Sequence, residues 1–168
     1  MPSETSPYQN LSASWEVFVE DLMVDCLNRD STNYAAYMDL RLKKHLPRAV
    51  CRAMLTGLGY VDFRGVSDIK KTAKRILVDA CNPFSAITGA NTVPIDEFTK
   101  MRNYLAHYSI HARRSLLSSY RANHKLKHFR EPADFLYARS PKTGFIRFAD
   151  YVLAYAAASQ EMRKKLGV

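Results

Sequence analysis

The chain has 168 residues, of which 47% are hydrophobic and 24% are charged, a balance that excludes an intrinsically disordered protein and suits one domain with its own core. Lys and Arg number 25 against 16 Asp and Glu, and the resulting net charge of +9 favours a polyanionic partner. No uncharged apolar run approaches the ~20 residues of a membrane-spanning helix and no secretory signal pattern opens the chain, so we expect a cytoplasmic protein without membrane contact.

Hydrophobic periodicity predicts an all-α protein, in which residues 1–11 form a flexible lead-in and residues 12–168 form a single helical domain. Three helices are predicted in the first part of the chain: one from Ser12 or Ser14 to Cys26, one that follows Asp30-Ser31-Thr32 and passes through Leu42, and one from Pro47 to Gly57 or Gly59. Three more follow: one from Ser67 or Asp68 to Ala80, one over residues 94–122, and one from Phe145 to Met162 with a basic end. We expect a loop over residues 83–93 and irregular structure over residues 129–144. No segment shows the alternation that predicts a β-strand.

The three cysteines, Cys26, Cys51 and Cys81, are widely spaced and form no Cys-x-x-Cys pair. Each falls on an apolar stripe of a predicted helix. Such cysteines are typical of small core residues in a reducing compartment, and they do not indicate a disulfide framework or a zinc site.

The positive charge is concentrated in residues 98–130, which contain no Asp or Glu. The stretch holds eight basic residues and four of the five histidines: Lys100, Arg102, Arg113, Arg114, Arg121, Lys125, Lys127, Arg130, His107, His111, His124 and His128. A stretch of this composition is either a solvated basic helix face or a phosphate-binding surface.

The helix predicted over residues 94–122 carries the residues best suited to chemistry. On a helical wheel Asn103 and His107 lie one turn apart and away from the apolar stripe, whereas Arg102 lies at the edge of that stripe. Arg102 and His107 differ by about 140° around the helix. They can share a site if the long Arg102 side chain swings toward the histidine, or if a two-fold dimer brings each arginine near the partner's histidine. Ile110 is predicted to lie beside His107 off the core and Tyr108 on the core side, so Ile110 is a candidate dimer contact.

The sequence Arg102-Asn103-x-x-x-His107 resembles the R-x(4–6)-H motif of the HEPN superfamily, small all-α proteins that include many dimeric, metal-independent ribonucleases of toxin, antiphage and RNA-processing systems. Trp15-Glu16 and Asn82-Pro83-Phe84 extend the resemblance to the HEPN group associated with RiboL-PSP domains, over most of the chain. HEPN toxins paired with a nucleotidyltransferase antitoxin carry a tyrosine two residues after the histidine, where this chain has Ser109.

The resemblance implies an HEPN-like helical bundle, a homodimer with a composite site, and a metal-independent endoribonuclease with Arg102, Asn103 and His107 as catalytic residues and no cofactor. The chemistry of these side chains agrees with that role. Attack by the ribose 2′-hydroxyl needs a base, an acid and a group that stabilises the phosphorane-like transition state, and no metal. A histidine can move the protons near neutral pH, and an arginine binds phosphate oxygens. Asn103 can orient the imidazole or donate to a phosphate oxygen.

Six further residues are candidates for contact with RNA. Tyr104 is predicted to be exposed beside the site, where it could stack on a base, and the basic residues form a candidate guiding surface: Arg113, Arg114, Arg121, Lys125 and Lys127.

Three other interpretations stay open. The first is a non-catalytic HEPN module that binds RNA or a partner protein, such as an antitoxin or another product of a defence operon. The second is an oligomerisation scaffold that binds no nucleic acid. The third is a zinc site, since His107/His111 and His124/His128 have the i, i+4 spacing of paired ligands, but the positive charge and the lack of a carboxylate in the stretch disfavour it.

Overall fold

The computed structural model describes residues 7–57 and 65–167, and it confirms the all-α prediction. The α-helices are α1 (Pro7–Arg29), α2 (Thr32–Tyr37), α3 (Arg48–Gly57), α4 (Val66–Ile76), α5 (Gly89–His107), α6 (Ile110–His124), α7 (Pro132–Tyr137) and α8 (Arg147–Leu166), and two 3-10 helices lie between α4 and α5, η1 (Asp79–Cys81) and η2 (Pro83–Ala86). Within the described ranges no strand forms, although Arg139 and Ile146 pair in an isolated β-bridge. None of the described helices is long and apolar enough to cross a membrane.

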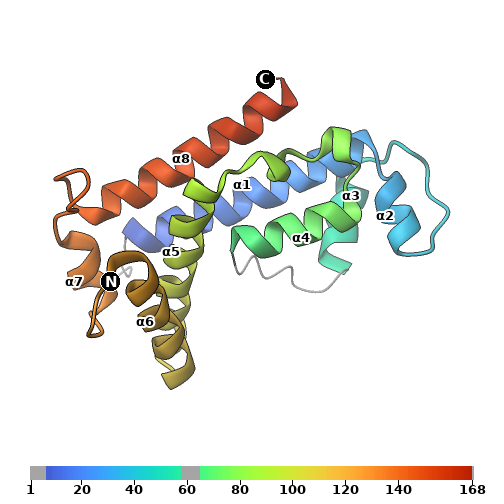
Figure 1. The fold of residues 1–168 in the computed structure, drawn as a ribbon. Coiled ribbons are helices and arrows are strands. Elements are labelled where there is room, and N and C mark those ends of the chain that lie inside the picture. Colours follow the sequence, from blue (N-terminus) through green and yellow to red (C-terminus); the bar gives the residue numbers. More distant parts are fainter. Residues whose placement is uncertain (1–6, 58–64, 168) are drawn as a thin grey trace, which may run out of the picture.

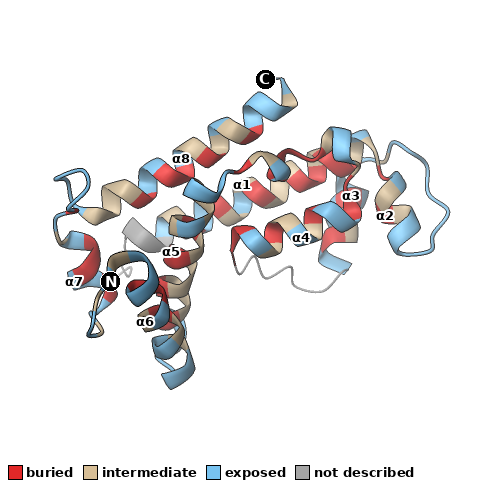
Figure 2. Cartoon of the chain, in the orientation of Figure 1, coloured by how far each residue is buried: buried red, intermediate tan, exposed pale blue. Residues whose placement is uncertain are grey.

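The helices form a body from which a hairpin projects (Figure 1). In the body, α8 packs against the first half of α5 and against η2, α3 packs against α1, and α4 packs against α2 and α5. The second half of α5 and α6 extend away from the body as an antiparallel pair (Figure 1). Figure 2 shows buried residues on the inner faces of α1, α4 and α8 and mainly exposed residues toward the free end of the hairpin. An aromatic group ties these helices together: the Trp15 ring meets Tyr155 edge-on with centroids 5.0 Å apart, and Phe98 of α5 lies 5.8 Å from the same tyrosine.

The prediction of one helix over residues 94–122 is wrong, because the chain reverses at residues 108–109 and forms two helices. Tyr108 adopts a left-handed conformation (φ 44°) that ends α5, and its N–H still donates to the Tyr104 carbonyl. Ser109 then caps α6, since its hydroxyl accepts from the N–H of Ala112 at 3.1 Å. The reversal lets the buried Leu116 and Tyr120 of α6 face α5. The apolar period continues through the turn, so the pattern alone does not reveal it.

Several other boundaries differ from the predictions. α1 begins at Pro7, so residues 7–11 are helical and are not part of a lead-in. The second helix ends at Tyr37, well before Leu42. α3 ends at Gly57, and Gly59, the alternative end, lies outside the described residues.

The C-terminal half of the predicted fold also needs correction. α5 starts at Gly89, inside the expected loop, and Pro94 lies within it, where the missing N–H removes one hydrogen bond near the helix start. A short helix, α7, forms inside the region predicted to be irregular. The last helix starts at Arg147, and Phe145 is 68% exposed.

The cysteine prediction is confirmed for two of the three residues. Cys26 and Cys51 are buried in the core, whereas Cys81 is only partly buried. All three are free thiols, and burial raises the pKa of Cys26 to about 12, so this thiol stays protonated.

Candidate functional site

The motif residues lie in the second half of α5. His107 is the last residue of the helix and is exposed at the free end of the hairpin. Asn103, one turn earlier, is partly buried. Arg102 faces the body, where its Nη2 lies 3.3 Å from Oε1 of Glu16 on α1. The prediction that His107 is no packing histidine of its own bundle is confirmed.

The α5 helix by itself does not bring Arg102 and His107 together. The two residues are separated by about 140° and roughly 7.5 Å along the axis. Arg102 points toward α1, and His107 lies at the turn between α5 and α6. A site that uses both side chains therefore needs either a new rotamer of Arg102, which would break the pair with Glu16, or a second chain.

The free end of the hairpin is apolar as well as basic. Tyr108 is 69% exposed and Ile110 is 72% exposed, on either side of the turn. The exposure predicted for Ile110 is confirmed, whereas the prediction that Tyr108 faces the core is wrong because the left-handed turn directs it outward. Exposed apolar side chains beside His107 form a contact surface of the kind that a partner chain can cover.

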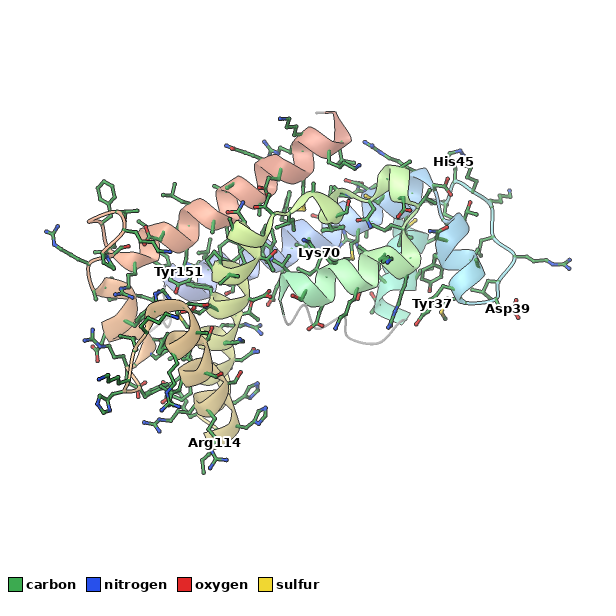
Figure 3. The ribbon with its side chains drawn as sticks, in the orientation of Figure 1. Tyr37, Asp39, His45, Lys70, Arg114 and Tyr151 are labelled. Carbon is green, nitrogen blue, oxygen red and sulfur yellow. The ribbon has the colours of Figure 1, made fainter. Side chains whose placement is uncertain are left out.

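The acid-free stretch, residues 98–130, forms the second half of α5, all of α6 and the segment after α6. Arg114 and Arg121 are exposed and seven residues apart, so they share one face of α6. Figure 3 shows Arg114 near the free end, directed away from the body. Lys125 and Lys127, after the helix, are also exposed. Arg113 differs, because its guanidinium lies over the Phe129 ring, 4.4 Å from the centroid, which leaves it less free for phosphate.

The prediction for Tyr104 is wrong. Its side chain is only 6% exposed, and its hydroxyl donates to Glu131 Oε1 at 3.1 Å. The ring meets Phe129 edge-on, with centroids 5.2 Å apart. Tyr104 therefore fixes the segment that follows α6 to the hairpin, and it is not available to stack on a base. The hairpin turn buries it, because the chain beyond α6 returns along α5.

The two histidine pairs do not have the geometry of helical zinc ligands. His107 ends α5 and His111 belongs to α6, with the turn between them. His124 ends α6 and is bonded to Glu97, whereas His128 lies beyond the helix and is exposed. Within the described ranges no three His, Cys, Asp or Glu side chains come together as metal ligands.

A second cluster, which the sequence reasoning missed, surrounds Glu97 in the first half of α5. The Glu97 side chain is 1% exposed. Its Oε1 accepts from His124 Nε2 at 2.9 Å and from the Tyr151 hydroxyl at 3.1 Å. Its Oε2 accepts from the Ser119 hydroxyl at 3.3 Å and from the amide of Asn123. We call these five residues the Glu97 cluster; it joins α5, α6 and α8.

The hydrogen bonds of this cluster favour the ionised form of Glu97. Burial by itself raises the pKa of Glu97, but the hydrogen bonds from His124, Asn123 and Tyr151 outweigh it and hold the pKa below its ordinary value. Nη1 of Arg147 lies 3.4 Å from His124 Nδ1. His124 therefore lies between the Glu97 carboxylate and the Arg147 guanidinium.

A cavity of about 630 Å³ opens beside the cluster. It lies between the first half of α5, the end of α6, the segment 140–143 and the first half of α8, and Glu97, Asn123, His124, Arg147 and Tyr151 form part of its lining. The sequence gives one signal for this site in retrospect: Glu97 is the last acidic residue before the basic stretch and directly precedes the core residue Phe98.

Comparison of the chain with known protein-family models, with curated proteins and with solved structures finds no match. The fold and the two sites define the protein as an all-α chain with a projecting basic hairpin. The resemblance to HEPN proteins is a resemblance of sequence motifs alone.

Proposed function

We propose that the protein is a metal-independent endoribonuclease of HEPN type. The observation that supports this best is the placement of His107: an exposed histidine at the free end of a hairpin whose sequence from Phe98 to its end has basic but no acidic side chains. A polyanion is attracted to this surface, and the histidine lies where a bound strand passes. Arg114, Arg121, Lys125 and Lys127 guide the strand.

The reaction uses the 2′-hydroxyl of the RNA as nucleophile. The 2′-oxygen attacks the adjacent phosphorus as it loses its proton to a base, and the bond to the 5′-oxygen breaks as that oxygen gains a proton from an acid. The products are a 2′,3′-cyclic phosphate and a 5′-hydroxyl. His107 acts in the proton transfers, Arg102 holds the phosphate oxygens, and Asn103 orients the imidazole or donates to the phosphate.

A homodimer completes this site. One His107 cannot be base and acid in the same step, and the Arg102 of the same chain is engaged with Glu16. Pairing of two hairpins through the exposed Tyr108 and Ile110 supplies two histidines and two arginines in one groove. The biological setting we propose is toxin or antiphage defence, with an antitoxin or another operon product as the candidate partner that restrains the activity.

A second candidate function is a non-catalytic module that binds RNA or a partner protein. The pair between Arg102 and Glu16 favours it, because an arginine held at 3.3 Å by a carboxylate on α1 is partly neutralised before any phosphate arrives. In this case the hairpin still binds RNA, but His107 does no chemistry.

The test is a cleavage assay on end-labelled RNA and single-stranded DNA in excess EDTA. Wild type, His107→Ala and the matched control His111→Ala, an exposed histidine on the first turn of α6, are compared. We expect wild type and His111→Ala to cleave RNA but not DNA, leaving a 2′,3′-cyclic phosphate, and His107→Ala to lose the activity. Binding without cleavage by a dimeric wild type would support the second candidate, and equal loss in both variants would contradict a specific role for His107.

A further inference from the structure

The cavity beside the Glu97 cluster lies away from the motif residues. Glu97 and Arg102 are five residues apart on α5, so their side chains leave the helix about 140° apart. The Arg102–Glu16 pair faces α1, whereas the cavity opens between α5, α6 and α8 (Figure 3, where Tyr151 marks its α8 side). Its volume of about 630 Å³ is within the range of small-molecule sites, which run from ~300 to ~1,000 Å³.

The floor of the cavity is polar. Each carboxylate oxygen of Glu97 accepts from two donors of the cluster, so Glu97 positions its neighbours and is not itself a ligand group. The amide nitrogen of Asn123 donates to Glu97 and to Ser119, so the cluster does not use the amide oxygen of Asn123, which can accept a hydrogen bond. Arg147 also lines the cavity and contacts the cluster through Nη1, which leaves other N–H groups of its guanidinium as donors. The floor therefore offers both an acceptor and a donor.

The walls are apolar. Val93 and Pro94 form one side and Leu153, Ala154 and Ala157 line the other. Val93 is 50% exposed and Leu153 is 61% exposed, so both present hydrocarbon surface to solvent at the edge of the cavity. A flat ring that enters between them removes this surface from water.

The rim carries a cation. Lys142 is exposed on the segment before α8. Among the described lining residues, Asp150 is the one acidic group besides Glu97, and its carboxylate accepts from the Thr143 hydroxyl at 2.8 Å. The rim thus favours an anionic group close to Lys142.

We propose that this cavity binds a nucleotide, with the base between Val93 and Leu153, its polar edge on Asn123 and Arg147, and its phosphate at Lys142. A heterocycle has donors and acceptors on its edge that can bind the floor, and a flat face that can pack between the walls. An aliphatic acid lacks such a polar edge. The site continues the basic surface, because Asn123 and His124 are the last residues of α6 and Lys125 follows them. The nucleotide is either a free nucleoside monophosphate or one residue of an RNA strand, and the site does not depend on cleavage at His107.

The test measures binding of AMP, GMP, CMP and UMP, each compared with its nucleoside and with inorganic phosphate, by calorimetry or NMR titration. Three variants are used after their folding is checked by circular dichroism. Ala90→Trp places an indole in the cavity from an exposed position on the first turn of α5, and Lys142→Ala removes the rim cation. Lys165→Ala is the matched control, an exposed lysine at the far end of α8.

We expect at least one monophosphate to bind wild type and Lys165→Ala equally, about tenfold more weakly to Lys142→Ala, and not measurably to Ala90→Trp. Absence of binding by all four monophosphates at millimolar concentration, binding unchanged in Ala90→Trp, or phosphate alone binding as tightly as the nucleotides would each overturn the proposal.

The source of the nucleotide is distinguished with short RNA in the His107→Ala background, which keeps the strand intact. If Ala90→Trp weakens RNA binding as it weakens monophosphate binding, the site takes a residue of the strand. If RNA binding is unaffected while monophosphate binding is lost, the site takes a free nucleotide. Neither readout depends on cleavage, so failure of the ribonuclease proposal leaves this result standing.

Discussion

The Glu97 carboxylate is buried, and both of its oxygens accept hydrogen bonds. An ionised carboxylate away from water is costly unless hydrogen bonds replace its hydration. Here four side chains do so: Ser119, Asn123 and His124 from α6 and Tyr151 from α8. The cluster therefore fixes the end of α6 against α5 and the start of α8, which is also the floor of the cavity.

Glu97→Gln should destabilise the protein strongly although it changes the volume little. One end of the amide carries two hydrogens and cannot accept, so donors that now meet Glu97 lose their acceptor. We expect a loss of roughly 3 kcal/mol in the free energy of unfolding, measured by urea denaturation. Glu131→Gln is the control, since Glu131 also accepts from a tyrosine hydroxyl but is exposed, and should cost less than about 1 kcal/mol. Equal losses would contradict a special role for the buried site.

The stability of wild type should also fall on acidification in a way that Glu97→Gln does not share. The folded pKa of Glu97 is below its ordinary value of about 4.3, so the unfolded chain binds the proton more readily. The stabilisation is complete above that ordinary value and is lost as pH falls through the lower folded pKa. Unfolding free energies measured from pH ~6 down to pH ~3 should therefore converge for the two proteins. Parallel curves would show that Glu97 does not carry this dependence.

The sequence predicts the exposure of some side chains correctly and of others wrongly. The exposure of His107 follows from its angle on the helix, and it is observed. Ile110 is also exposed as predicted, but it lies on α6 beyond the turn, so its angle on one continuous helix does not explain it. Tyr104 also lies outside the apolar stripe of the helical wheel, but it is buried because Phe129 and Glu131, beyond α6, pack against it. The Glu97 cluster joins residues up to 54 positions apart, so no local pattern contains it.

At the scale of elements, the start of α4 depends on α5. Asp96 of α5 accepts from the N–H of Val66 and from the Ser67 hydroxyl at 3.0 Å, so a side chain from another helix caps α4. Gly65, immediately before α4, has φ 153°, and a Cβ there would meet the Asp96 carboxylate. Helix periodicity finds α4 itself, but not this cap, because the capping residue lies thirty positions away.

Gly65→Ala should therefore destabilise the protein by about 1–3 kcal/mol, since the methyl group both strains the backbone and displaces the capping carboxylate. Gly57→Ala is the matched control: Gly57 is the last residue of α3, and a Cβ there meets no described residue within 4 Å. It should leave the protein unchanged or slightly more stable. The comparison is made by thermal and urea denaturation, and a Gly65→Ala protein as stable as Gly57→Ala would refute the proposed cap.

Across the whole molecule, the excess positive charge is concentrated in residues 98–130. Many acids of α1 are paired with arginines of α3: Arg52 bonds Glu20 at 2.8 Å and also Asp21, and Arg48 pairs with Asp25. These pairs neutralise the body, whereas Arg114 and Arg121 on the hairpin are exposed and lie in the acid-free stretch. The sequence predicts where the charge is concentrated, but the projection of that stretch as a hairpin follows from the turn at Tyr108.

The double variant Arg114→Ala/Arg121→Ala should weaken RNA binding and reduce its salt dependence. Each phosphate contact on a single strand contributes about 0.7 to the slope of log affinity against log salt, so loss of two contacts lowers the slope by about 1.4. Lys164→Ala/Lys165→Ala removes the same charge from the end of α8, where both lysines are exposed, and should leave the slope unchanged. Fluorescence anisotropy from 50 to 300 mM salt, with His107→Ala present in every protein, measures both slopes without cleavage. Because the two variants have the same net charge, equal slopes would mean that RNA responds to the charge of the whole protein, whereas a difference confined to the hairpin variant locates the bound strand on α6.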